Sequence, residues 1–223
     1  MSQNEVADSA RPAAGAEYYD VNYGDYVLQN SPAKLDFYLS LIQRYVPLGA
    51  DIYELGVGMG LFFERAAQKF HCRGCDVNQF GVAATSERVA GAALTVGSCE
   101  TIPTEPPQRA VVAWDVLEHL PDIDKGLATI FERLPAGGYL MAVVPVYDGP
   151  LGWLVEMLDK DPTHVSKWGR YRWLETLQRH RFEVVEWGGI IRRLMSGRYL
   201  HFTSPGWLLR PAGSAIYFVA RKP

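Results

Sequence analysis

The residues best suited to binding a ligand form one short segment, Glu54-Leu55-Gly56-Val57-Gly58-Met59-Gly60. It follows a strand-like run, Asp51 to Tyr53, and a helical pattern begins directly after it. Glycines at such a strand-to-helix turn leave backbone N–H groups exposed and let a ligand approach the main chain closely. We interpret the segment as a nucleotide-type binding loop; the alternative is a tight turn that binds nothing.

The spacing of the glycines separates two classes of ligand. A dinucleotide fingerprint, G-x-G-x-x-G, that began at Gly56 would require a third glycine at position 61, where this chain has Leu61. The third glycine instead comes one residue earlier, at Gly60, and an acidic residue stands two places before the first. The resulting pattern, E-x-G-x-G-x-G, argues against NAD.

A carboxylate follows the second predicted strand. Asp76 stands 20 residues after Gly56 and is followed by Val77 and Asn78. A carboxylate at this position can accept hydrogen bonds from both hydroxyls of a ribose. The alternative is a surface turn residue that caps the next helix.

Taken with later segments, this pattern resembles the class I S-adenosylmethionine (SAM)-dependent methyltransferases. Gly97-Ser98-Cys99-Glu100 stands where the family commonly has Gly-Asp-Ala-Glu, so Ser98 replaces the aspartate that usually meets adenine. Asp115-Val116-Leu117-Glu118-His119-Leu120-Pro121 resembles ubiquinone-type and related small-molecule enzymes of methyltransferase types 11, 12 and 23. The segment Leu134 to Leu140 resembles the family's Leu-Lys-Pro-Gly-Gly turn. The resemblance covers residues 51 to 187, and residues 18 to 47 more loosely.

The resemblance implies that SAM is the cofactor and S-adenosylhomocysteine (SAH) its product. Tyr18, Tyr19 and Tyr23 are expected to form a lid over the amino-acid end of the cofactor, unless these rings serve only in packing. The expected cofactor-binding residues are Tyr19, Tyr23, Glu54, Gly56, Gly58, Gly60, Asp76, Val77, Asn78, Ser98, Cys99, Glu100, Asp115 and Val116.

Two histidines are the candidate catalytic residues. Methyl transfer mainly requires that the acceptor be positioned, and a hydroxyl acceptor also benefits from a base, for which an imidazole is suited near neutral pH. His164 leads because Asp161-Pro162-Thr163-His164-Val165-Ser166 resembles a segment of family members that modify glycans, lipids or quinones, and His119 is second. For each, a structural hydrogen bond is the alternative. We expect no metal, although Asp115, Glu118 and His119 could be ligands, as in some quinone O-methyltransferases.

Hydrophobic periodicity predicts alternating helices and strands, which implies an α/β fold with a parallel sheet and helices on both faces. The resemblance implies the Rossmann-like, doubly wound form: a mostly parallel seven-stranded sheet with an antiparallel last strand. The predicted helices cover residues 31–47, 60–69, 79–90, 122–134 and 169–180, and the predicted strands cover 51–55, 71–76, 93–96, 110–115, 138–146, 182–187 and 215–220.

One domain is expected over residues 31–223, preceded by a flexible tail and lid over residues 1–30. Two irregular stretches, 147–168 and 188–213, are candidate substrate covers because long loops in compact domains usually carry function. The segment 190–210 combines apolar residues with Arg192, Arg193, Arg198 and Arg210, and we expect it to favour an apolar or anionic small molecule.

Composition narrows the class of protein further. The chain has 223 residues, a pI near 6.0 and no Lys/Arg-dense segment, which weighs against nucleic acid as a partner. Residues 1–150 carry a net charge of −9 and residues 151–223 one of +6, so an anionic substrate or membrane surface is conceivable. Three cysteines, with Cys72 and Cys75 expected in the core, and the lack of a signal peptide predict a cytoplasmic protein.

The predicted function is SAM-dependent methyl transfer to a small-molecule acceptor such as a glycan, lipid, quinone or secondary metabolite, with a hydroxyl as the first choice of acceptor group. Two alternatives stay open. One is a non-catalytic SAM-binding or partner subunit, and the other is a methyltransferase that acts on protein or nucleic acid.

Overall fold

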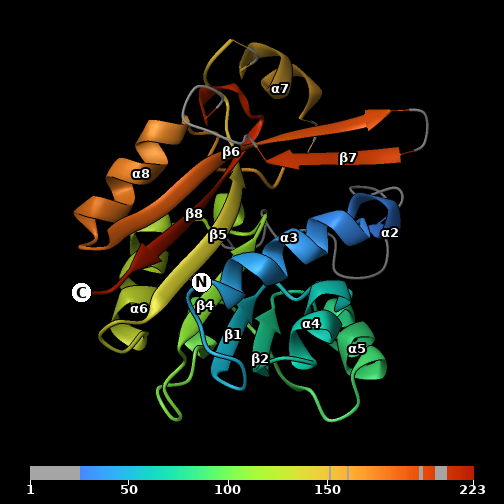
Figure 1. Ribbon diagram of the computed structural model, residues 1–223, viewed down its shortest axis with the longest axis vertical. Helices are drawn as coiled ribbons and strands as arrows, with labels where there is room; N and C mark the ends of the chain where they lie inside the picture. The colour runs from blue at the N-terminus through green and yellow to red at the C-terminus, as the bar shows by residue number, and fades with distance from the viewer. Residues whose placement is uncertain (1–25, 151, 160, 196–197, 204–209) are drawn as a thin grey trace, which may run out of the picture.

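The computed structural model describes residues 26–150, 152–159, 161–195, 198–203 and 210–223 (Figure 1). Helices and strands alternate along most of this length. In chain order the elements are α2 (Tyr26–Gln29), α3 (Pro32–Gln43), β1 (Asp51–Leu55), α4 (Leu61–Ala67), β2 (His71–Asp76), α5 (Gln79–Arg88), β3 (Ala93–Val96), η1 (Cys99–Thr101), β4 (Ala110–Trp114), η2 (Leu117–His119), α6 (Ile123–Arg133), β5 (Tyr139–Pro145), α7 (Gly152–Leu158), α8 (Arg170–Arg179), β6 (Glu183–Met195), β7 (Arg198–Thr203), η3 (Arg210–Ala212) and β8 (Ala215–Arg221).

One mixed sheet organises these elements, with the strand order β3-β2-β1-β4-β5-β8-β6-β7. Strands β1 to β5 pair in parallel. Strand β8 lies antiparallel between β5 and β6, and β7 pairs antiparallel with β6. The predicted α/β fold, mostly parallel with an antiparallel last strand, is confirmed. Strand order reverses between β1 and β4, and in such sheets ligands bind beyond the carboxyl ends of the strands at that point.

Both faces of the sheet are buried, because side chains of each central strand alternate between two apolar clusters. Ile52 and Val112 belong to the cluster formed with α3 and α4. Tyr53 and Val111 belong to the cluster formed with α6 and α8. Helices therefore cover both faces, as Figure 1 shows. The three cysteines are free thiols, and Cys75 and Cys99 are buried as core residues.

The two stretches predicted to be irregular contain regular structure. Helix α7 lies within 147–168, and β6 continues to Met195 before β7 pairs back along it. The prediction of seven strands with an irregular 188–213 is wrong in this respect, because the sheet has eight. In the sequence, the pair Gly188-Gly189 suggests that the strand ends there, although β6 continues through both residues. A Cβ on Gly188 would lie 2.5 Å from the Tyr217 ring, and one on Gly189 would lie 2.6 Å from the Arg210 carbonyl oxygen. These glycines accommodate closely packed neighbours within the strand.

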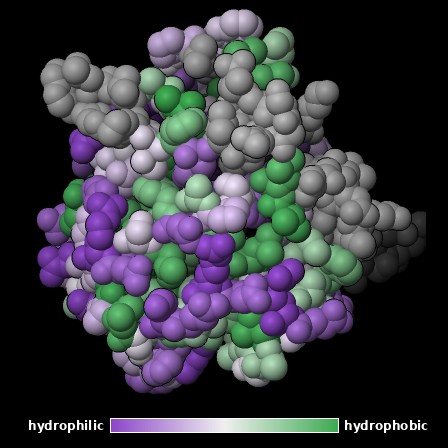
Figure 2. Space-filling model, turned by 45° about the vertical axis from the view of Figure 1, so that its right-hand side comes forward, coloured by the Kyte–Doolittle hydropathy of each residue, from purple (hydrophilic) through white to green (hydrophobic). Residues whose placement is uncertain are grey.

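The surface mixes polar and apolar residues. Figure 2 shows hydrophilic side chains spread over the lower part of one face, with hydrophobic ones scattered among them. Among the described residues, no helix has the length and apolar character needed to cross a membrane.

Candidate functional site

The glycine loop after β1 has a backbone that only glycine adopts easily. Gly56, Gly58 and Gly60 have φ values of 71°, 54° and 77°, in the left-handed region. A Cβ on Gly56 would lie 2.4 Å from Val116 Cγ2, and one on Gly58 would lie 2.3 Å from the Tyr26 hydroxyl oxygen. The predicted loop therefore lies against the segment after β4 and against α2.

Asp76 holds this loop in place. Its Oδ2 accepts a hydrogen bond from Gly58 N at 2.8 Å, and its Oδ1 accepts one from Asn78 N at 2.8 Å. Burial raises the pKa of this carboxyl group, and the two backbone hydrogen bonds partly offset the rise. Asn78 in turn caps α5 by accepting from Phe80 N, whereas Val77 is exposed. Each Asp76 oxygen keeps a second lone pair, so the ribose contact stays a prediction compatible with this geometry.

The Tyr26 hydroxyl oxygen lies 3.4 Å from Met59 N of the loop, and three nearby carboxyl groups influence its pKa. Burial raises the pKa of this phenol, and the charges of Glu54, Asp76 and Asp115 raise it further. Glu54 is itself buried, and its Oε2 has no hydrogen-bond partner among the described residues. Burial and, secondarily, Asp76 raise its pKa well above the usual range. An orphaned carboxylate beside an open-backbone glycine loop fits a ligand with cationic groups, and SAM carries a sulfonium and an ammonium.

The segment predicted to meet adenine has a different environment at each residue. Ser98 N donates to Glu100 Oε1 at 2.8 Å, so the Glu100 carboxylate closes the turn. Cys99 packs in the apolar core with Cys75. Any adenine contact at Cys99 would therefore come from its backbone.

Asp115, directly after β4, joins three elements. Its φ is 58°, and its carboxylate lies 3.3 Å from Lys34 Nζ of α3 and 2.7 Å from Arg192 Nη1 of β6. Burial alone would raise the pKa of Asp115, but the two cations outweigh it and lower the value to about 2. The ionised carboxylate therefore fixes the helix and the hairpin over the carboxyl end of β4.

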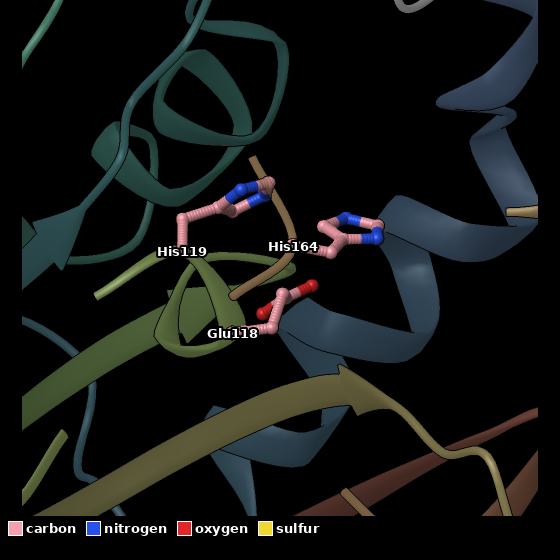
Figure 3. A group of neighbouring side chains, drawn as sticks. All are labelled: Glu118, His119 and His164. Carbon is pink, nitrogen blue, oxygen red and sulfur yellow. The ribbon is translucent and has the colours of Figure 1, made fainter. Parts of the chain in front are cut away.

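The structure brings His119 and His164 together. Val165 N and Ser166 N each donate to the Glu118 carbonyl oxygen at 3.1 Å, which attaches the 161–166 segment to η2. The two imidazole centroids are then 4.7 Å apart. Figure 3 shows both rings beside the Glu118 carboxylate. Burial and the neighbouring His164 lower the pKa of His119. Both predicted catalytic residues thus lie in one cluster at the carboxyl edge of the sheet.

Each imidazole is oriented through its Nδ1 atom. His164 Nδ1 lies 2.9 Å from Asp159 Oδ2, which also accepts from the Tyr147 hydroxyl at 2.6 Å. Although burial opposes it, these hydrogen bonds lower the pKa of Asp159 to about 2. His119 Nδ1 lies 2.9 Å from the Thr163 hydroxyl oxygen. Because Asp159 is ionised and the Thr163 hydroxyl donates to Asp161, both Nδ1 atoms are the donors, so in a neutral ring the lone pair is on Nε2.

Glu118 completes the cluster; the sequence suggests it only as an alternative metal ligand beside Asp115 and His119, and not as a catalytic or cofactor-binding residue. It is 1% exposed, and neither carboxylate oxygen has a hydrogen-bond partner among the described residues. Burial, and next Asp115, raise its pKa well above the usual range. Figure 3 shows the carboxylate directed toward the two rings. Its position beside His119 in an Asp-x-x-Glu-His run was the available sequence signal.

The predicted lid residues Tyr18, Tyr19 and Tyr23 lie outside the described residues. Tyr26, three positions after Tyr23, is the tyrosine that contacts the glycine loop, and sequence reasoning missed it. The sequence feature that could have indicated Tyr26 is the group of tyrosines that precedes α3.

Residues 53–142 match the family model described as a methyltransferase domain. No curated protein matches the sequence significantly. Similar solved structures include a Thermotoga maritima protein described as a SAM-dependent methyltransferase, with histamine N-methyltransferase suggested as its activity. It is 15% identical, with a TM-score of 0.65, covering 93% of this chain and 94% of that one.

Two further structures share the fold. A chain from the complex between the Haloferax volcanii Trm112 methyltransferase activator and a methyltransferase is 15% identical, with a TM-score of 0.70, covering 96% of this chain and 100% of that one. The N-methyltransferase NodS from Bradyrhizobium japonicum, in complex with SAH, is 16% identical, with a TM-score of 0.58, covering 88% of this chain and 90% of that one.

Proposed function

We propose that this chain, in which residues 53–142 match a methyltransferase domain, is a SAM-dependent methyltransferase that methylates a hydroxyl group of a small molecule. The choice of a hydroxyl as the acceptor group rests on one observation, the pair of oriented imidazoles, His119 and His164, at the carboxyl edge of the sheet. A hydroxyl must lose its proton as it is methylated, and an imidazole is suited to assist that loss.

The cofactor would be held by residues around the glycine loop. We propose that backbone groups of Gly56, Gly58 and Gly60 border it, that Asp76 accepts from the ribose, and that Glu54 faces its cationic groups. When bound, SAM supplies a methyl group attached to a positively charged sulfur. The remaining predicted contacts, at Tyr19, Tyr23, Val77, Asn78, Ser98, Cys99, Glu100, Asp115 and Val116, belong to the same proposal.

His164 and His119 would activate the acceptor. His164 leads because Asp159 and Tyr147 contact its Nδ1 and fix the ring, so that Nε2 is the nitrogen left to face the acceptor. Positioning by the surrounding residues would provide most of the rate, since methyl transfer is an in-line displacement.

The stretches 147–168 and 188–213 would cover the acceptor. Trp153 and Met157 on α7 and Phe202 on β7 expose apolar side chains, while Arg192 brings a cation to the end of β4. The exposed apolar side chains suit an apolar small molecule. The net charge of +6 over residues 151–223 suits an anionic one, since Arg192 already pairs with Asp115.

The test is to incubate the protein with methyl-labelled SAM and a metabolite extract, and then to identify the labelled product. We expect a labelled small molecule with a new O-methyl group. His164→Ala should lower its formation at least about 100-fold while SAM affinity stays within twofold, and exposed His71→Ala is the matched control. Label in protein or nucleic acid, or heat of binding for NAD and none for SAM, would overturn the proposal.

A further inference from the structure

Three side chains at the carboxyl edge of the sheet have the composition of a metal site. One carboxylate oxygen of Glu118 and one ring nitrogen each of His119 and His164 all lie within 4.8 Å of one another (Figure 3). A bound ion at about 2.1 Å from each donor requires donor separations of about 3 to 3.5 Å. Small side-chain rotations would close the difference.

The environment of these donors leaves their lone pairs available. Both Nδ1 atoms donate to neighbours, Thr163 for His119 and Asp159 for His164, so Nε2 is the nitrogen of each ring that is left to bind an ion. A histidine ligand ordinarily has such an acceptor on its second nitrogen. Two histidines oriented in the same way are the arrangement that ligation needs.

Glu118 gives an independent indication. A carboxylate that is 1% exposed, with both oxygens unpartnered among the described residues, is costly to bury unless something compensates it. Lys34 and Arg192 act on Glu118 through their charge, but each forms its ion pair with Asp115 and neither donates a hydrogen bond to the Glu118 oxygens. Asp161 Oδ2, 3.9 Å from His164 Nε2, adds a further negative charge beside the cluster. A bound cation would supply the partner that these two carboxylate oxygens lack.

We propose that Glu118, His119 and His164 bind one divalent first-row transition ion, such as Zn²⁺ or Co²⁺. Two imidazoles and one carboxylate suit ions of borderline softness better than Mg²⁺ or Ca²⁺, and three protein ligands leave positions open. The role of the ion rests on the proposed function, with the two imidazoles acting on the acceptor through the ion and no longer as bases: the ion would hold the acceptor oxygen and favour loss of the hydroxyl proton to solvent. That oxygen then bonds to the methyl carbon of SAM as the C–S bond breaks, its electron pair remaining on sulfur to give SAH. Asp115, held by two cations, is not a ligand in this assignment.

The test uses the untagged full chain, treated with a chelator and dialysed. Titration with Co²⁺, followed by visible absorption, and with Zn²⁺, followed by calorimetry, should each show one ion per chain. Glu118→Gln and His164→Asn should each weaken binding at least about 100-fold, and Asp159→Asn about 10- to 100-fold. His71→Asn, at an exposed histidine remote in sequence from the cluster, should bind like the parent chain. SAH affinity should be unchanged in all four variants.

Absence of stoichiometric binding, or equal binding by Glu118→Gln and the parent chain, would overturn the inference. If Glu118→Gln does not fold, His164→Asn decides, because that histidine lies on a loop. Methyl transfer by chelator-treated protein without Co²⁺ binding would reject the metal and keep the proposed function. Stoichiometric Co²⁺ binding without methylation of any small molecule would keep the metal site and reject the proposed function.

Discussion

Gly58 offers the sharpest test of the cofactor loop, through replacement by alanine. Its φ of 54° disfavours any side chain, and the added Cβ would lie 2.3 Å from the Tyr26 hydroxyl oxygen. Gly49 is a matched control, because its φ is 76° and a Cβ there would meet nothing within 4 Å. Both substitutions should lower the free energy of unfolding by about 1 to 2 kcal/mol, the cost of a left-handed backbone.

Only Gly58→Ala should affect the cofactor. The new methyl group would displace Tyr26 and narrow the approach to the exposed backbone, so we expect SAH affinity to fall at least tenfold, which is about 1.4 kcal/mol. Gly49→Ala should leave the affinity within twofold. Urea unfolding gives the stability of each variant, and calorimetry gives its affinity for SAH. Equal SAH affinities in the two variants, with both folded, would show that the ligand does not approach the loop at Gly58.

Two further substitutions probe the carboxylates around the loop. Asp76→Ala should weaken SAH binding, measured by calorimetry, by about 1.5 to 3 kcal/mol, which is the usual contribution of hydrogen bonds to a charged group. The variant should also be less stable, because Gly58 N and Asn78 N lose their acceptor. A folded variant with parental affinity would reject the ribose assignment. Asp115, with its pKa lowered to about 2 from about 3.9, should contribute about 2 kcal/mol of stability that is fully present above pH 4 and lost as the pH falls through about 2. Urea unfolding between pH 7 and pH 2 should show that the free energy of unfolding of Asp115→Asn falls less steeply with falling pH than that of the parent chain. The control Asp124→Asn, at an exposed ion pair, should lower the free energy of unfolding by at most about 1 kcal/mol. The same pH dependence in Asp115→Asn and the parent chain would contradict the ion-pair assignment.

The parallel part of the sheet could be predicted from sequence because its signals are local. Strands β4 and β5 are buried on both faces and therefore read as continuous apolar runs, and the glycine loop lies directly after β1. Helix α6 begins after Asp122, whose side chain accepts from Lys125 N as an N-cap should. Each of these features is decided within a few neighbouring residues.

The β6–β7 hairpin could not be predicted in the same way. Gly188 and Gly189 resemble a turn in sequence, yet tertiary neighbours, the Tyr217 ring and the Arg210 carbonyl, require glycine inside a strand. The candidate histidines were identifiable by type, but their proximity depends on hydrogen bonds from Val165 N and Ser166 N to the Glu118 carbonyl. Contacts between residues more than 20 positions apart leave no periodic trace.

The segment from Asp115 to His119 links the two halves of the site. Val116 packs where a Cβ on Gly56 would clash, so this segment limits the conformation of the glycine loop. Two residues later, the Glu118 carbonyl holds the loop that carries His164. If the proposed function holds, the distance between a methyl group above the glycine loop and an acceptor beside the histidines is set by this one short turn. We then expect acceptor choice to depend on the exposed apolar side chains of α7 and β7, which do not contact the turn's hydrogen bonds to residues 165 and 166.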